Sequence, residues 1–181
     1  MDTTGIKALI EKYGLFQMGD KVGARKLNTK GISREQFVKE CGPHKAEIIA
    51  YFEFEKKAKE ELWAKQKATF NAIPGVPEVR QARKQREEWL RELNRMIEEG
   101  NGRMPQFKAP TQEELAQLEA HYPIACFALQ AEDRAYTTVN AELSAIWKDT
   151  YNALCDGQDP ETVKAAHDKR IAEYAAAHIW D

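Results

Sequence analysis

The chain has 181 residues, of which 43% are hydrophobic and 31% charged, and its formal net charge is −2. This composition fits an ordinary globular domain with charged surface helices, and no run of about eighteen apolar residues is present that could cross a membrane. The N-terminus lacks the basic and then apolar layout of a signal peptide, and three widely spaced cysteines do not form a disulfide framework, so we expect a cytoplasmic protein.

The small net charge conceals an uneven distribution along the chain. Residues 1–45 carry nine lysines and arginines against five acidic residues, and residues 46–99 carry eleven of each. Residues 100–181 carry seven basic against thirteen acidic residues. The basic beginning and the acidic end therefore need not contact the same partner.

The first forty-two residues predict two short helices joined by a polar, glycine-rich segment. Ile6, Leu9 and Tyr13 recur at helical spacing before Gly14, which predicts a helix over 3–13. Residues 14–24 are the one place where a strand is admissible. Ser33 predicts the start of a second helix, whose buried side carries Phe37, Val38 and Cys41.

Residues 43–99 predict two long helices joined at the sequence Ile-Pro-Gly-Val-Pro of residues 73–77. The second helix carries an apolar seam, widened by Leu90 and Ile97, and we expect this seam to pack on residues 43–72 in an αα-hairpin. The seam consists of Ala82, Arg86, Trp89, Leu93 and Met96.

The last third of the chain predicts three more helices after a loop over residues 100–110. Thr111 begins the first; the second is expected to run unbroken over residues 124–154, with alanines that allow another helix to approach closely. Asp159 and Pro160 begin the third. We therefore predict an all-α protein of six to seven helices, with an N-terminal segment (1–42), a hairpin (43–99) and an acidic part (100–181), the last two forming one domain.

Enzymatic motifs do not appear in the sequence. It contains no phosphate-binding loop, dinucleotide fingerprint or paired-histidine zinc motif, and Cys41 and His44 lack a second pair of ligands. His167 and His178 are expected at the edge of a buried stripe. We therefore predict no catalytic residue, no metal site and no cofactor.

Residues 20–40 resemble a helix-turn-helix, a DNA-binding motif. Ala24 and Leu27 fit its first helix, residues 31–33 its turn, and the segment beginning at Arg34 its recognition helix. A basic structural connector is the alternative. The resemblance implies a nucleic-acid-binding set of Lys21, Arg25, Lys26, Lys30, Arg34, Gln36 and Lys39.

A second basic row lies on the predicted helix 78–99. At 100° per residue, Arg80, Lys84, Arg91 and Arg95 fall within about 60° of one another and could contact a phosphate backbone or an acidic protein groove. The alternative is a solvated helix face, on which nearby glutamates pair with these cations.

Taken together, these features favour a non-catalytic binding protein that acts on nucleic acid or on a nucleoprotein complex. The segment from Gly23 to Phe37 and the mixed-charge helices after it are similar to small helical proteins of phages and mobile elements, among them anti-CRISPR inhibitors of Cas nucleases. That resemblance implies inhibition by occlusion or conformational locking. The alternative is an oligomeric helical assembly protein of a phage or mobile element.

Overall fold

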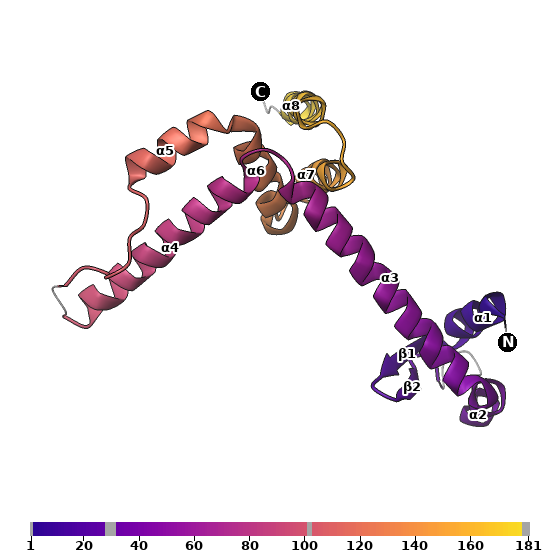
Figure 1. The fold of residues 1–181 in the computed structure, drawn as a ribbon. Helices are drawn as coiled ribbons and strands as arrows, with labels where there is room; N and C mark the ends of the chain where they lie inside the picture. Colours follow the sequence, from indigo (N-terminus) through magenta and orange to yellow (C-terminus); the bar gives the residue numbers. More distant parts are fainter. Residues whose placement is uncertain (1, 28–31, 101–102, 179–181) are drawn as a thin grey trace. The chain divides into compact units, whose positions relative to one another are not determined.

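The computed structural model describes residues 2–27, 32–100 and 103–178, and these residues confirm the all-α class. They form eight α-helices, one 3-10 turn and one small antiparallel sheet. Figure 1 labels the α-helices and the two strands in chain order. The chain divides into two compact units, Met1–Trp63 and Ala64–Asp181. This division falls inside the stretch 43–99 that was expected to be one hairpin.

The N-terminal unit surrounds a small apolar core to which most of its elements contribute. Asp2 caps the first helix by accepting a hydrogen bond from the Gly5 amide, and Gly14 ends it at a φ of 60°. Ser33 caps the second through the Gln36 amide, as the sequence predicts. The elements are α1 (Thr3–Tyr13), β1 (Leu15–Met18), β2 (Lys21–Ala24), α2 (Arg34–Cys41), η1 (Gly42–His44) and the first part of α3 (Lys45–Asn71). Their buried side chains are Ile6, Leu9, Tyr13, Leu15, Cys41 and Ile48.

The helix-turn-helix prediction is wrong in its first helix. Residues 15–24 form a hairpin instead, in which Met18 pairs with Lys21 across the turn at Gly19, whose φ is 58°. A Gly-Asp pair between two short runs of strand-forming residues is the local signal for such a turn. Gly23 has a specific role, because a β-carbon there would overlap the Phe16 ring on the facing strand.

The two long helices and the break between them are confirmed. α3 ends at Asn71 and α4 (Val76–Glu98) begins after Gly75, which has a φ of 86°. A β-carbon on Gly75 would overlap the Tyr122 side chain, so glycine is required there by both conformation and space. The turn buries Ile73 and Val76 in the core of the C-terminal unit.

The apolar seam of α4 is its less exposed side, but its neighbours differ from the expected one. All five seam residues are half-buried, whereas Leu90 and Ile97 are exposed. Within the C-terminal unit, α4 packs against α5 (Gln112–His121) and α6 (Pro123–Thr137), and it makes few contacts with the α3 residues of the same unit, 64–71. Arg83 donates to Glu119 of α5 at 2.7 Å, and Arg80 donates to Glu132 of α6 at 2.7 Å. Ion pairs therefore join α4 to both α5 and α6.

Residues 124–154 are divided into two helices, which corrects the prediction of one. α6 ends at Thr137, Thr138 is extended, and Asn140 caps α7 (Ala141–Cys155) by accepting from the Leu143 amide. The chain thus folds back, and α6 and α7 form the most extensive helix pair of the C-terminal unit. α8 (Pro160–Ala177) begins at the Asp159 cap, as predicted, and packs on both.

We expect Gly75→Ala to destabilise the C-terminal unit by about 2 kcal/mol or more, because it adds a steric overlap with Tyr122 to the cost of a left-handed backbone. Gly100→Ala is the matched control. Gly100 also has a positive φ, but a β-carbon there meets no atom within 4 Å, so the control incurs only the backbone cost of about 1 kcal/mol. Chemical denaturation of the full chain measures both; equal losses would contradict the role of Tyr122.

Candidate functional site

The predicted nucleic-acid-binding residues lie on two different kinds of local structure. Lys21 begins β2, Arg25 and Lys26 follow it, and Arg34, Gln36 and Lys39 lie on α2. Lys30 lies outside the described residues. The second helix of the predicted motif is therefore present, but a strand, not a helix, precedes it.

Three members of this set are held by contacts within the N-terminal unit. Lys26 donates from Nζ to the Glu11 carbonyl at 2.5 Å. Gln36 donates from Nε2 to Glu40 at 3.0 Å, and the Arg25 guanidinium lies 5.2 Å from the centre of the Phe16 ring. These contacts reduce the freedom of the three side chains to meet a ligand.

An ion pair between α1 and α2 also neutralises a nearby cation. Lys12 donates to Glu40 at 2.7 Å. This bond and the one from Gln36 lower the pKa of Glu40 to about 2, so the carboxylate stays charged and the Lys12 charge is balanced over the whole physiological range.

Four cations of the N-terminal unit are exposed and have no ion-pair partner among the described residues. They are Lys21, Arg34, Lys39 and Lys45. Three of them come from the predicted set, and Lys45 is an addition from the first residue of α3. Their charge is thus available to an external anion.

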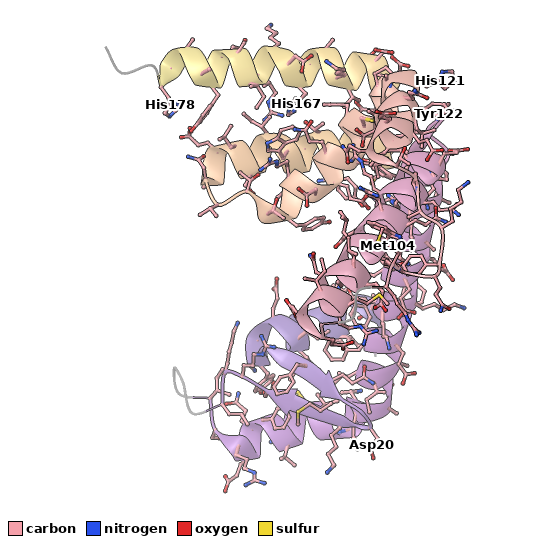
Figure 2. The ribbon with its side chains drawn as sticks, turned by 90° about the vertical axis from the view of Figure 1, so that its left-hand side faces the viewer. Asp20, Met104, His121, Tyr122, His167 and His178 are labelled. Atoms are coloured by element: carbon pink, nitrogen blue, oxygen red, sulfur yellow. The ribbon has the colours of Figure 1, made fainter. Side chains whose placement is uncertain are left out.

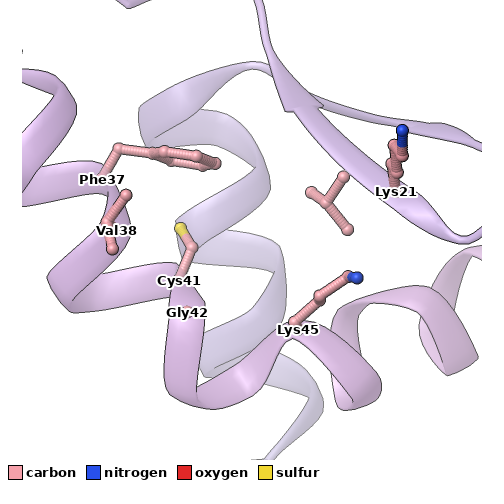
Figure 3. Close-up of a pocket in the computed structure, with 7 residues that line it drawn as sticks. Lys21, Phe37, Val38, Cys41, Gly42 and Lys45 are labelled. Atoms are coloured by element: carbon pink, nitrogen blue, oxygen red, sulfur yellow. The ribbon is translucent and has the colours of Figure 1, made fainter.

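A groove with apolar walls lies between two of these lysines. It has a volume of about 280 Å³. Figure 3 shows Phe37, Val38 and Cys41 of α2 on one side of it, with Lys21 of β2 and Lys45 of α3 on the other. Val38 is 57% exposed although it is apolar. On α2, Arg34 shares the face of Val38, one turn earlier, so three unpaired cations border an apolar surface.

The basic row of α4 has a different environment. Lys84 lies 3.8 Å from Glu88, and Arg91 donates to Glu87 at 2.6 Å. Arg95 donates to both Glu92 and Glu99, and its hydrogen bonds to Glu92 lower the pKa of that carboxyl group. Arg80 donates to Glu132 of α6, and to Asn71. Each cation of this row therefore has a carboxylate partner, as expected for the alternative interpretation of a solvated helix face.

A second cavity, of about 670 Å³, lies within the C-terminal unit and is lined from α6, α7 and α8, with Arg83 of α4 at its edge. His167 of α8 lines it beside the rings of Trp147 and Phe127, at centroid distances of 4.1 and 5.4 Å. Figure 2 shows the His167 side chain directed from α8 toward α7. It is 4% exposed and therefore more deeply buried than the stripe edge predicted for it.

The hydrogen bonds of Thr150 define the tautomer of His167. Thr150 donates its hydroxyl hydrogen to the Ile146 carbonyl at 2.8 Å, and its oxygen lies 2.9 Å from Nδ1 of His167. Because a hydroxyl has one hydrogen, Nδ1–H of His167 donates to Thr150 and Nε2 is unprotonated. Burial lowers the pKa of His167, so the neutral ring is favoured.

Comparison with protein-family models, with curated proteins and with solved structures finds no match. Within the described part of the chain, no group of three or more metal-ligating side chains is close enough to hold an ion. The helices described there also lack the combination of length and apolar character that a bilayer crossing requires.

Sequence reasoning missed Lys45 and the apolar groove. Lys45 was counted in the basic charge of residues 1–45 but lies outside the helix-turn-helix window. The groove has no signal in the sequence, because Val22 and Val38 reach the same cavity only after the hairpin packs near α2.

The buried His167 predicts a loss of stability at acidic pH. The pKa of His167 in the folded state lies below its unfolded value of 6.5. Its contribution to the free energy of unfolding is therefore complete above pH 6.5 and is lost as the pH falls through the folded-state pKa. The unfolding temperature of the wild type should therefore fall between about one pH unit above 6.5 and about one unit below it, and we expect His167→Gln to make this fall smaller. His178→Gln, an exposed change on the same segment, is the control; an equal effect of both changes would contradict this origin.

Proposed function

We propose that this chain is a non-catalytic binding protein that acts on nucleic acid or on a nucleoprotein complex, and that its N-terminal unit makes the contact. The observation that carries the proposal is a set of four exposed cations that have no carboxylate partner in the part of the chain that the structure describes, Lys21, Arg34, Lys39 and Lys45. Phosphate groups are the most abundant partners for such a surface, and binding to them releases counterions.

The apolar groove favours a nucleoprotein over bare nucleic acid. Phosphate recognition requires no apolar walls, and the one aromatic ring in the groove, Phe37, packs edge-on against Tyr13 at 5.6 Å. It is therefore poorly placed to stack a base. A protein partner could insert an apolar side chain at Val38 while its acidic groups, or the phosphates beside it, meet the three bordering cations.

The more specific form of the proposal is a mobile-element inhibitor of a CRISPR nuclease. It rests on the resemblance of the chain to small helical anti-CRISPR proteins and on the uneven charge of the sequence. Residues 100–181 carry six more acidic than basic residues, and such a surface could compete with nucleic acid for a basic nuclease channel. Inhibition would then arise from occlusion or conformational locking.

A gel-shift measurement on duplex DNA at several salt concentrations tests the general proposal. We expect the triple variant Lys21→Ala, Arg34→Ala and Lys45→Ala to weaken binding and to reduce the salt slope by about 3, because each phosphate contact contributes about 0.9. The matched control is the triple variant Lys84→Ala, Arg91→Ala and Arg95→Ala, which removes three cations already paired on α4.

The control variant is expected to bind as the wild type does. Equal weakening by both triple variants would show that overall charge is responsible and would contradict an N-terminal interface. Absence of binding by the wild type at low salt would remove the nucleic-acid part of the proposal.

DNA cleavage by a guide-loaded Cas nuclease, titrated with the full chain, tests the specific form. We expect cleavage to fall with added protein, and the uncharged change Val38→Asn to weaken the inhibition by about tenfold while duplex binding changes by less than about twofold. Lys56→Asp, an exposed change on α3 away from the groove, is the control. Cleavage that stays unchanged across representative Cas nucleases would refute this form.

A further inference from the structure

α3 carries an apolar stripe that begins at the half-buried Tyr51 and that the described part of the N-terminal unit leaves exposed from Phe54 onward. Tyr51, Phe54, Ala58 and Leu62 fall within about 80° of one another at 100° per residue. Phe54 is 70% and Leu62 56% exposed. Large apolar side chains grouped in this way on a surface indicate an interaction site.

The stripe borders a shallow groove with α1. The groove has a volume of about 350 Å³, and Thr3 and Lys7 of α1 line it together with the stripe residues. It is distinct from the groove at Val38, with which it shares no lining residue. A partner of helical shape could therefore lie along α3 without occupying the basic surface.

We infer that the occupant is a second copy of this chain, with the two α3 helices antiparallel. The first argument is the symmetry of the stripe about Ala58. Phe54 precedes Ala58 by four residues and Leu62 follows it by four, so a two-fold axis at Ala58 places each Phe54 opposite the partner's Leu62. The small side chain at the centre lets the two backbones approach.

The second argument is the charge on the two flanks of the stripe. One flank carries Glu55 and then Lys59; the other carries Lys57 and then Glu61. An antiparallel second copy presents each flank in reverse order, so glutamate meets lysine on both sides. These four residues sum to zero charge, which gives a phosphate backbone or an anionic membrane no electrostatic preference for this face.

The contacts inside one chain leave these flanks able to make such pairs. Lys59 has no ion-pair partner among the described residues, and Lys57 lies 3.9 Å from Glu61 in an exposed pair that is easily exchanged. Glu55 accepts a hydrogen bond of 2.5 Å from the Tyr51 hydroxyl, which holds the carboxylate at the edge of the stripe.

Sedimentation velocity of the full chain over a range of concentrations tests the inference. We expect a monomer–dimer equilibrium, with Phe54→Asp raising the dimer dissociation constant by at least about tenfold, equivalent to about 1.4 kcal/mol. Val38→Asp makes the same change at another exposed apolar position of this unit and is expected to leave the equilibrium unchanged. Far-UV circular dichroism of both variants confirms that helix content is retained.

Disulfide cross-linking tests the antiparallel register. Ala58→Cys lies on the proposed two-fold axis, so mild oxidation should produce a covalent dimer, whereas Lys56→Cys, on the opposite side of α3, should not. A sedimentation coefficient that stays monomeric at every concentration, a dimer insensitive to Phe54→Asp, or equal cross-linking at both cysteines would overturn the inference. None of these results bears on DNA binding, which the gel shift measures separately.

Discussion

The C-terminal unit depends on one packing constraint, the alanine face of α6. Ala125, Ala128 and Ala131 are completely buried, and Ala135 is 1% exposed. Since these side chains end at the β-carbon, α4 and α7 can pack closely against the helix backbone. The close packing around α6 also explains why Gly75, just before α4, lies against Tyr122, the residue that precedes α6. A larger residue at position 75 would push α4 away from α6.

The position of carboxylates, rather than the number of cations, distinguishes the two basic regions. α4 has glutamates three or four residues from Lys84, Arg91 and Arg95, so its charges are balanced along the same helix. In the N-terminal unit Glu40 pairs with Lys12, whereas Lys21 and Lys45 have no ion-pair partner among residues 2–27, 32–100 and 103–178. A basic row with acids at helical spacing is therefore weak evidence for anion binding, whereas cations gathered from separate elements around a groove are stronger evidence.

The exposed apolar side chains extend the same reasoning to protein partners. Val38 belongs to a groove bordered by positive charge, while Phe54 and Leu62 belong to a stripe whose flanks are neutral overall. Different charge around similar apolar surfaces favours different occupants, an acidic or phosphate-bearing partner at the first and a second copy at the second. If both are occupied, dimerisation brings two basic surfaces to one nucleoprotein, and binding gains from the linkage.

The sequence by itself determined the all-α class, the two long helices, and the caps at Ser33, Thr111 and Asp159. These features follow from hydrogen bonds and backbone preferences that span three or four residues, so they are visible in a short window. The sequence-based prediction was wrong at two places where a local turn or cap signal competes with helical periodicity. A hairpin with its turn at Gly19 replaces the first helix of the helix-turn-helix, and the cap at Asn140 divides the segment 124–154. Only the tertiary structure decided that α4 packs on α5 and α6, and that Lys45 and Val38 border one groove. The sequence pattern of an amphipathic helix shows which of its faces is apolar but not which neighbour covers that face, because the neighbour depends on contacts between residues far apart in the chain.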